Sequence, residues 1–241
     1  VSGYLDLRQA VCTKFLRDNG LEFAPEQIVV STGAKQSIAN AVLAIVDKDD
    51  EVIIPTPFWV TYSEIVKLAG GKPVLVRTTI DNGFRITPEQ LEAHITPKTR
   101  LFMFSSPCNP SGAIYSKEDL AGLVKVFSRH PEIVIMSDEI YEYINYEGRH
   151  ESIASFPEVK DRTIVINGLS KGYAMTGWRV GYMAAPLPIA KACEKLQGQF
   201  TSATNSIAQR AAIAALTGDM TPTHDMLQAF RTRRKRILEL L

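Results

Sequence analysis

The sequence predicts an α/β fold in which helices cover both faces of a large, mostly parallel β-sheet. Strand-like and helix-like segments alternate along the chain as far as Leu187, which is the order of elements in such folds. The strand-like runs are apolar at consecutive positions, as expected for strands buried between two helical layers. With 45% hydrophobic and 22% charged residues, the chain has enough apolar side chains for a sizeable core.

The predicted strands are short runs rich in valine, isoleucine, phenylalanine and methionine. They lie at residues 28–30, 51–54, 73–76, 101–104, 133–136, 163–166 and 180–183. Helices are predicted between them. Apolar residues at i, i+3, i+4, i+7 and i+8 predict a helix over 34–46. Thr87 and Ser116 are N-caps that begin two further helices. Beyond Leu187 three helices are expected, at 188–199, 205–217 and 223–241.

The charge and cysteine content argue against several classes of partner and of binding site. The 27 basic and 26 acidic residues give a net charge of +1, which argues against nucleic acid or a membrane surface as the main partner. The basic run at 231–236 is expected to be a solvated helix face or a connection to a further segment. No apolar run has the length of a membrane span, so we expect a soluble, cytoplasmic protein. Three widely spaced cysteines predict neither a disulfide nor a metal site.

Ligands of open α/β sheets bind beyond the carboxyl ends of the strands, and polar residues follow several of the predicted strands. After 28–30, Gly33 opens a helix whose first N–H groups could hold an anion. After 101–104, Asn109 is flanked by prolines in a stiff loop. Each feature alone is also typical of a turn without function.

Two more strand ends carry ionisable residues. Asp138 ends the run at 133–136 with Tyr141 three residues later, although an acid there is often only a helix cap. Ser170 and Lys171 follow the run at 163–166, and Arg179 comes eight residues after the lysine. A lone lysine at such a place is commonly a surface residue. The dinucleotide, P-loop, nucleophile-elbow and zinc-protease motifs are all absent from the sequence.

Three strings, taken together, resemble the class I aminotransferases, which are fold-type I pyridoxal-phosphate enzymes. They are Ser106-Pro-Cys-Asn-Pro-Ser-Gly112, Ser137-Asp-Glu-Ile-Tyr141, and Ser170-Lys171 followed by Thr176-Gly-Trp-Arg-Val-Gly-Tyr182. The resemblance covers essentially the whole chain. It implies pyridoxal 5'-phosphate as the cofactor, an amino acid and a 2-oxo acid as substrates, and a homodimer.

The resemblance also implies roles for individual residues. Lys171 would hold the cofactor as an imine and move the substrate proton, and Asp138 would pair with the pyridinium nitrogen. Asn109 and Tyr141 would hydrogen-bond the phenolic oxygen. The phosphate would be held by a group of donors that comprises Gly33, Ala34, Lys35, Ser170 and Arg179. Trp59 would stack on the ring; on composition alone it is a core tryptophan.

The substrate is predicted from the turn Gly33-Ala34-Lys35-Gln36. It is similar to the Gly-Gly-Lys-Gln turn of the bacterial-type aspartate and prephenate aminotransferases, whose lysine meets the distal carboxylate of an acidic substrate. Lys35 therefore favours aspartate or glutamate, and Trp59 and Asn109 are further candidate substrate contacts. The alternative is a solvent-facing lysine in the first turn of a helix, where its charge opposes the helix dipole.

The chain departs from the family pattern in several places. Gly168 stands where many relatives have a serine that contacts the phosphate. The tyrosine that reaches the neighbouring subunit's phosphate would precede this segment, and the arginine for the substrate α-carboxylate would follow it. We therefore expect a piece of a longer protein, with residues 1–217 as the cofactor-binding large domain. Residues 218–241 are expected to be a helix that connects it toward a small C-terminal domain.

Two other functions stay open on the sequence. One keeps the cofactor but catalyses β-elimination or C–S bond cleavage, because the same large domain supports both reactions. The other is the effector-binding domain of a transcription regulator built on an aminotransferase fold, which requires a DNA-binding segment upstream.

Overall fold

The computed structural model describes residues 1–241 and confirms the predicted sheet. Seven strands lie in the order β1-β7-β6-β5-β4-β2-β3. Their bounds are β1 Ile28–Ser31, β2 Glu51–Thr56, β3 Lys72–Arg77, β4 Thr99–Ser105, β5 Val134–Asp138, β6 Thr163–Gly168 and β7 Gly181–Ala184. Only β7 is antiparallel to its two neighbours, β1 and β6. The carboxyl ends of the other six strands therefore share one edge of the sheet.

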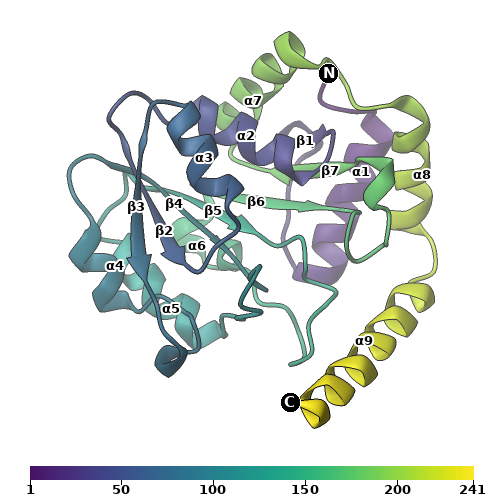
Figure 1. Ribbon diagram of the computed structural model, residues 1–241. Coiled ribbons are helices and arrows are strands. Elements are labelled where there is room, and N and C mark those ends of the chain that lie inside the picture. The colour runs from purple at the N-terminus through teal and green to yellow at the C-terminus, as the bar shows by residue number, and fades with distance from the viewer.

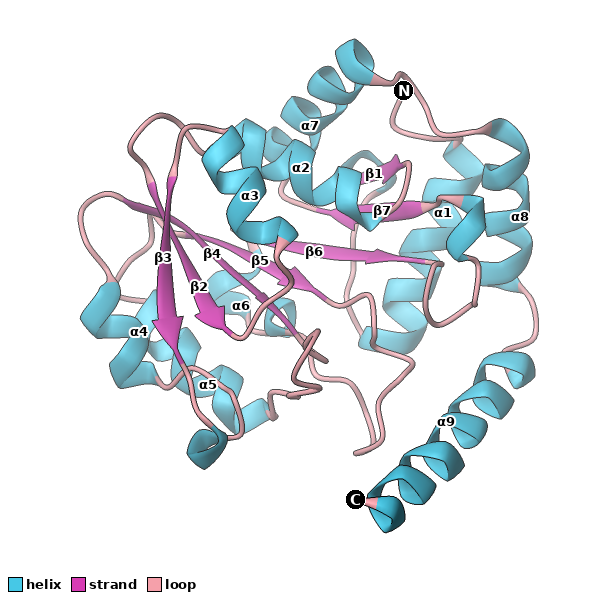
Figure 2. Ribbon diagram, viewed as in Figure 1, coloured by secondary structure: helices cyan, strands magenta, loops and turns pink.

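Helices cover both faces of the sheet (Figures 1 and 2). Their bounds are α1 Leu5–Lys14, α2 Ala34–Ile45, α3 Thr61–Leu68, α4 Pro88–His94, α5 Lys117–Phe127, α6 Pro157–Lys160, α7 Leu187–Phe200, α8 Ser206–Thr217 and α9 Thr221–Leu240. A π-helical turn, Phe15–Asn19, continues α1. No helix is both long and apolar enough to cross a membrane.

The core is divided by the sheet into two layers. On one face α2, α3 and α7 pack against residues such as Val29, Ile54 and Met103. On the other face α1 and α8 cover the β1 and β7 side of the sheet, and α4, α5 and α6 cover the β4 and β5 side. Successive residues of a strand enter opposite layers: Val29 belongs to the first, and Ile28 and Val30 to the second. Burial on both faces explains why the strands read as continuous apolar runs.

Helix α3 was absent from the sequence prediction, although it contributes to the site. α3 spans Thr61–Leu68 and buries Tyr62, Ile65 and Val66, whose spacing of i, i+3 and i+4 is the signal that could have found it. At the other end of the chain, α9 extends away from the sheet (Figure 1), and its residues 231–236 are exposed. This exposure agrees with both expected alternatives for the basic run, a solvated helix face or a connection to a further segment.

Candidate active site

A cavity of about 190 Å³, open to solvent, lies at the edge where the parallel strands end. Nine of the ten residues proposed from the sequence line it, and Gly33 lies directly behind it. Ala34 begins the helix after β1, Trp59 follows β2, Asn109 follows β4, Asp138 ends β5 and Lys171 follows β6. Parallel strands bring these side chains together because their carboxyl ends share an edge.

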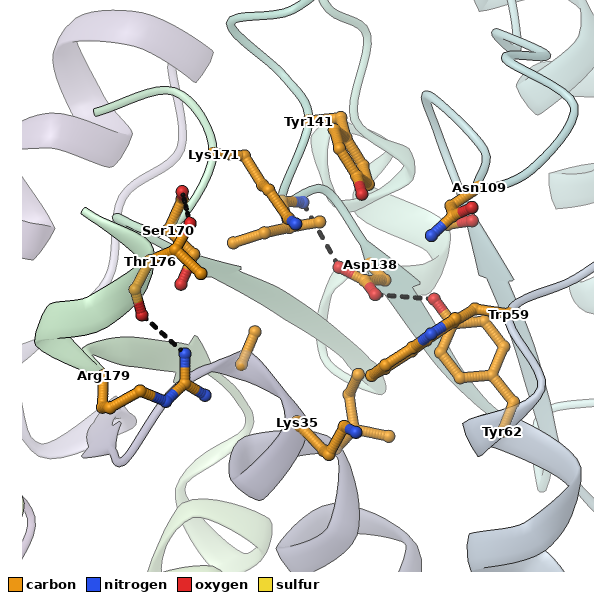
Figure 3. A pocket seen from close by; sticks show the side chains of 14 residues that line it. Lys35, Trp59, Tyr62, Asn109, Asp138, Tyr141, Ser170, Lys171, Thr176 and Arg179 are labelled. Carbon is orange, nitrogen blue, oxygen red and sulfur yellow. Dashed lines mark hydrogen bonds between the residues drawn. The ribbon is translucent and has the colours of Figure 1, made fainter. Parts of the chain in front are cut away.

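One end of the cavity can hold an anion. Arg179 lies here with Ser170 and Thr176, on the left side of Figure 3. Gly33 has a φ of 87°, a conformation that favours glycine, and a Cβ atom there would meet the guanidinium of Arg179. The first turn of α2 leaves the N–H groups of Ala34 and Lys35 without partners inside the helix. A guanidinium and free N–H groups together form a donor set for a phosphate.

Arg179 itself is held in an unusual backbone conformation. Its φ of 54° and ψ of 50° lie in the left-handed region, which costs a residue with a side chain roughly 1–2 kcal/mol. Its Nη1 donates to the carbonyl oxygen of Thr176 at 2.9 Å. This strained conformation directs the guanidinium toward Gly33. Strained backbone conformations of this kind are typical of functional sites.

Asp138 occupies the floor of the cavity and is 5% exposed. Its Oδ2 accepts a hydrogen bond from the Tyr62 hydroxyl at 2.6 Å, and its Oδ1 accepts one from the N–H of Ile140 at 3.2 Å. Burial raises the pKa of Asp138 to about 6, against these two hydrogen bonds, which lower it. No helix begins after Asp138, so the helix-cap interpretation of this acid is wrong. A buried carboxylate with two neutral partners is suited to bind a cation.

Lys171 and Tyr141 face each other across the cavity. The Lys171 ammonium lies 5.5 Å from the centre of the Tyr141 ring, and Figure 3 shows both side chains directed into the space above Asp138. Asn109 lies on the opposite side from Arg179 (Figure 3). The structure therefore places the Lys171 amine in one cavity with a carboxylate, a phenol and an amide, where it could act as a nucleophile.

Lys35 and Trp59 form the remaining wall. Nζ of Lys35 lies 4.7 Å from the centre of the Trp59 ring, within the range of a cation–π contact. The Lys35 side chain is exposed overall, yet it lines the cavity. Trp59 is only half-buried and lines the cavity with it, so it is not a core tryptophan.

Five lining residues of the cavity were not proposed from the sequence: Ile38, Tyr62, Ser105, Ile140 and Thr176. Tyr62 is 1% exposed and donates to Asp138, and it was missed because α3 was missed. Thr176 lines the cavity and its hydroxyl donates to the carbonyl oxygen of Ser170 at 2.7 Å. At Gly168 there is little room for a larger residue, since a Cβ atom there would lie 2.9 Å from the Cα of Gly181.

Comparison with known proteins adds the family context. The sequence profile of the family described as "Aminotransferase class I and II" matches residues 1–241. An aspartate/prephenate aminotransferase from Nitrosomonas europaea is 51% identical over 97% of this chain and 59% of that protein. The chain thus spans about three fifths of the length of this relative.

Solved structures match equally well. The aspartate aminotransferase of Rhizobium meliloti superposes with a TM-score of 0.97 at 45% identity, over 99% of this chain and 60% of that one. An aromatic aminotransferase from Pyrococcus horikoshii gives a TM-score of 0.95 at 38% identity, over 99% of this chain and 65% of that one. Proteins named for different substrates share this fold, so the fold alone does not choose the substrate.

Proposed function

The chain belongs to the class I and II aminotransferases, and on this premise we propose that the full-length protein transfers the amino group of aspartate or glutamate to a 2-oxo acid with pyridoxal 5'-phosphate. One observation carries the proposal: a single cavity joins the Lys171 amine, the buried Asp138 carboxylate and the Arg179 guanidinium. The sequence relation to an aspartate/prephenate aminotransferase supports the acidic substrate.

The donors present fit this cofactor at both of its charged ends. At one end, the Arg179 guanidinium lies close to the glycine turn before α2, and this cradle suits a phosphate. At the other end, the buried carboxylate of Asp138 has only neutral partners, which suits a protonated ring nitrogen. Asn109 and Tyr141 would then bind the phenolic oxygen, and Trp59 would cover the ring.

The chain's own residues perform the remaining tasks. Pyridoxal phosphate, when bound, supplies an electron-withdrawing ring that stabilises negative charge on the substrate α-carbon. Lys171 would hold it covalently and, once free, its Nζ would take the proton from the substrate Cα as a general base. Asp138 would pair with the protonated ring nitrogen and so hold its proton. Tyr62 fixes the carboxylate of Asp138 by its hydrogen bond.

Lys35 is the residue we propose for substrate choice. Its ammonium is held over Trp59 at the cavity wall, where it could meet the distal carboxylate of aspartate. Lys35→Ala in the full-length protein should lower kcat/KM for aspartate, because one partner of a charge pair is lost. The expected loss of transition-state stabilisation is roughly 2–4 kcal/mol. Activity toward phenylalanine should change much less, and Lys67→Ala on the exposed side of α3 is the matched control.

The test is a panel of amino donors assayed with both variants. Equal losses on all donors would show that Lys35 serves the phosphate or the fold, and the dicarboxylate assignment would fall. Pyruvate release from a donor with a β-leaving group, without amino transfer, would instead support the lyase alternative. A DNA-binding segment in the full-length sequence would support the regulator alternative.

We also propose a homodimer whose second subunit completes the phosphate end of the cavity. Trp178 and Ile207 are 47% and 71% exposed and line a second hollow beside Arg179. Apolar side chains exposed next to a charged site are typical of an interface. The domain boundaries at 217 and 218 and the cytoplasmic location stay predictions.

A further inference from the structure

A group of buried polar side chains lies behind the cavity wall and has no part in the roles above. Lys14, Glu142 and Asn167 are 0%, 5% and 1% exposed. The Lys14 ammonium is ion-paired with the Glu142 carboxylate, and it also donates to Oδ1 of Asn19 at 2.8 Å. Charged side chains are buried this completely only where pairing and hydrogen bonds offset the loss of water.

Glu142 is the centre of this network and collects donors from two other segments. Asn19 Nδ2 donates to its Oε2 at 2.9 Å, and Asn167 Nδ2 donates to its Oε1 at 2.8 Å. Asn167 Oδ1 in turn accepts from the N–H of Gly168 at 2.7 Å. Because both ends of the Asn167 amide are engaged, its orientation is fixed. The network therefore ties the end of α1 to the end of β6.

Two members of this network, Glu142 and Asn167, are close in sequence to residues that line the cavity. Glu142 follows Tyr141 in the turn after β5. Asn167 is the second-last residue of β6, and Lys171 follows in the next turn. A shift of the Glu142 carboxylate would therefore move Tyr141 and Lys171 relative to each other.

Two further contacts support this coupling. A Cβ atom at Gly172 would lie 2.5 Å from Cδ2 of Tyr143, so the turn after Lys171 and the turn after Tyr141 are packed tightly. The π-helical turn Phe15–Asn19 brings Asn19 back beside Lys14. Such turns interrupt regular helices and frequently mark functional sites.

We propose that Lys14 and Glu142 are a positioning pair for the active site. Their buried ion pair holds the segment of Asp138 and Tyr141 in register with the segment of Lys171. Stability does not require charges here, because a well-packed apolar pair is often at least as stable as a buried ion pair. The charged pair instead contributes directional hydrogen bonds to Asn19 and Asn167. These bonds allow only one arrangement of the end of α1, the turn after β5 and the end of β6. The proposal rests on the proposed binding of pyridoxal phosphate.

The test uses two double variants of the full-length protein. K14M/E142L replaces the pair by apolar side chains, and K14M/E142Q removes the charges but keeps an acceptor for Asn167. We expect K14M/E142L to unfold at a lower temperature, because the amides of Asn19 and Asn167 lose their acceptor. It should also bind pyridoxal phosphate roughly 10- to 100-fold more weakly, as when an outer-shell partner is lost. The loss should be smaller in K14M/E142Q.

Two readouts separate positioning from general stability. The visible absorbance of bound pyridoxal phosphate should titrate at a shifted pH in K14M/E142L. In the cofactor-free protein, amide exchange over residues 138–143 and 167–172 should be about tenfold faster than in the wild type. The matched control is Arg162→Met at the opposite end of β6, where the guanidinium donates to the carbonyl oxygens of Phe127, His130 and Ile133. It should alter neither readout.

Wild-type affinity, titration and exchange in K14M/E142L would overturn the proposal. So would an equal effect of Arg162→Met, because the network would then act only through stability. If the wild-type protein itself fails to bind pyridoxal phosphate, the proposed function falls. In that case the exchange measurement alone still decides whether the pair positions the two segments.

Discussion

The layer of α4 and α5 and the edge around the cavity differ in how well the structure agrees with local sequence preferences. In the layer, local signals agree with the fold: Thr87 accepts from the N–H of Gln90, and Ser116 accepts from the N–H of Asp119, each as an N-cap. At the edge, local preferences are broken, since Arg179 has a left-handed backbone and the carboxylate of Asp138 is buried. Such departures are expected where side chains must be held for chemistry, although Asp49 and Phe84, which do not line the cavity, also have positive φ values.

The largest expected effect comes from the charge at the edge. Asp138→Asn should still bind the cofactor, because an asparagine oxygen can accept from Tyr62, but it should lower kcat by roughly a thousandfold or more. The proton on the ring nitrogen would have no carboxylate to hold it. Asp138→Glu should lose less. Steady-state kinetics check this, and near-normal turnover of Asp138→Asn would contradict the role of this acid.

A second prediction concerns stability of the cofactor-free protein against pH. Burial raises the pKa of Asp138 from 3.8 to about 6, so the folded state binds this proton more tightly than the unfolded chain. The wild type should then lose stability relative to Asp138→Asn as the pH rises from about 4 through 6, by about 3 kcal/mol in total. Denaturant unfolding at several pH values measures the difference. Parallel pH profiles of the two proteins would contradict the burial of an ionisable carboxylate.

The smallest effect is expected in the α4 and α5 layer. Thr87→Ala or Ser116→Ala removes an N-cap and should cost about 1 kcal/mol of unfolding free energy, with kcat/KM unchanged. Thr13→Ala is the control, since its hydroxyl is exposed and bonds only the carbonyl oxygen of Gln9. A loss of kcat/KM in the cap variants, measured at a temperature where they are folded, would show that the two regions are not separable.

The same contrast explains what could be predicted from the sequence. The strands, the helices after Thr87 and Ser116, and the residues at the strand ends follow from apolar patterns, caps and motif resemblance. The contact of Tyr62 with Asp138 joins positions 76 apart, and no local pattern indicates it. Lys14 reads as an ordinary lysine at the end of a helix, and only the packing of α1 against the turn after β5 shows that it is buried.

The central claim is that Lys171 is the amine that holds the cofactor at this edge. The most direct measurement is borohydride reduction of the full-length protein with pyridoxal phosphate, followed by peptide mapping. The account predicts a yellow protein and one labelled peptide, the one that contains Lys171, with the label lost in Lys171→Ala. A label on Lys35 or on any other lysine in place of Lys171, or no chromophore at all, would contradict it.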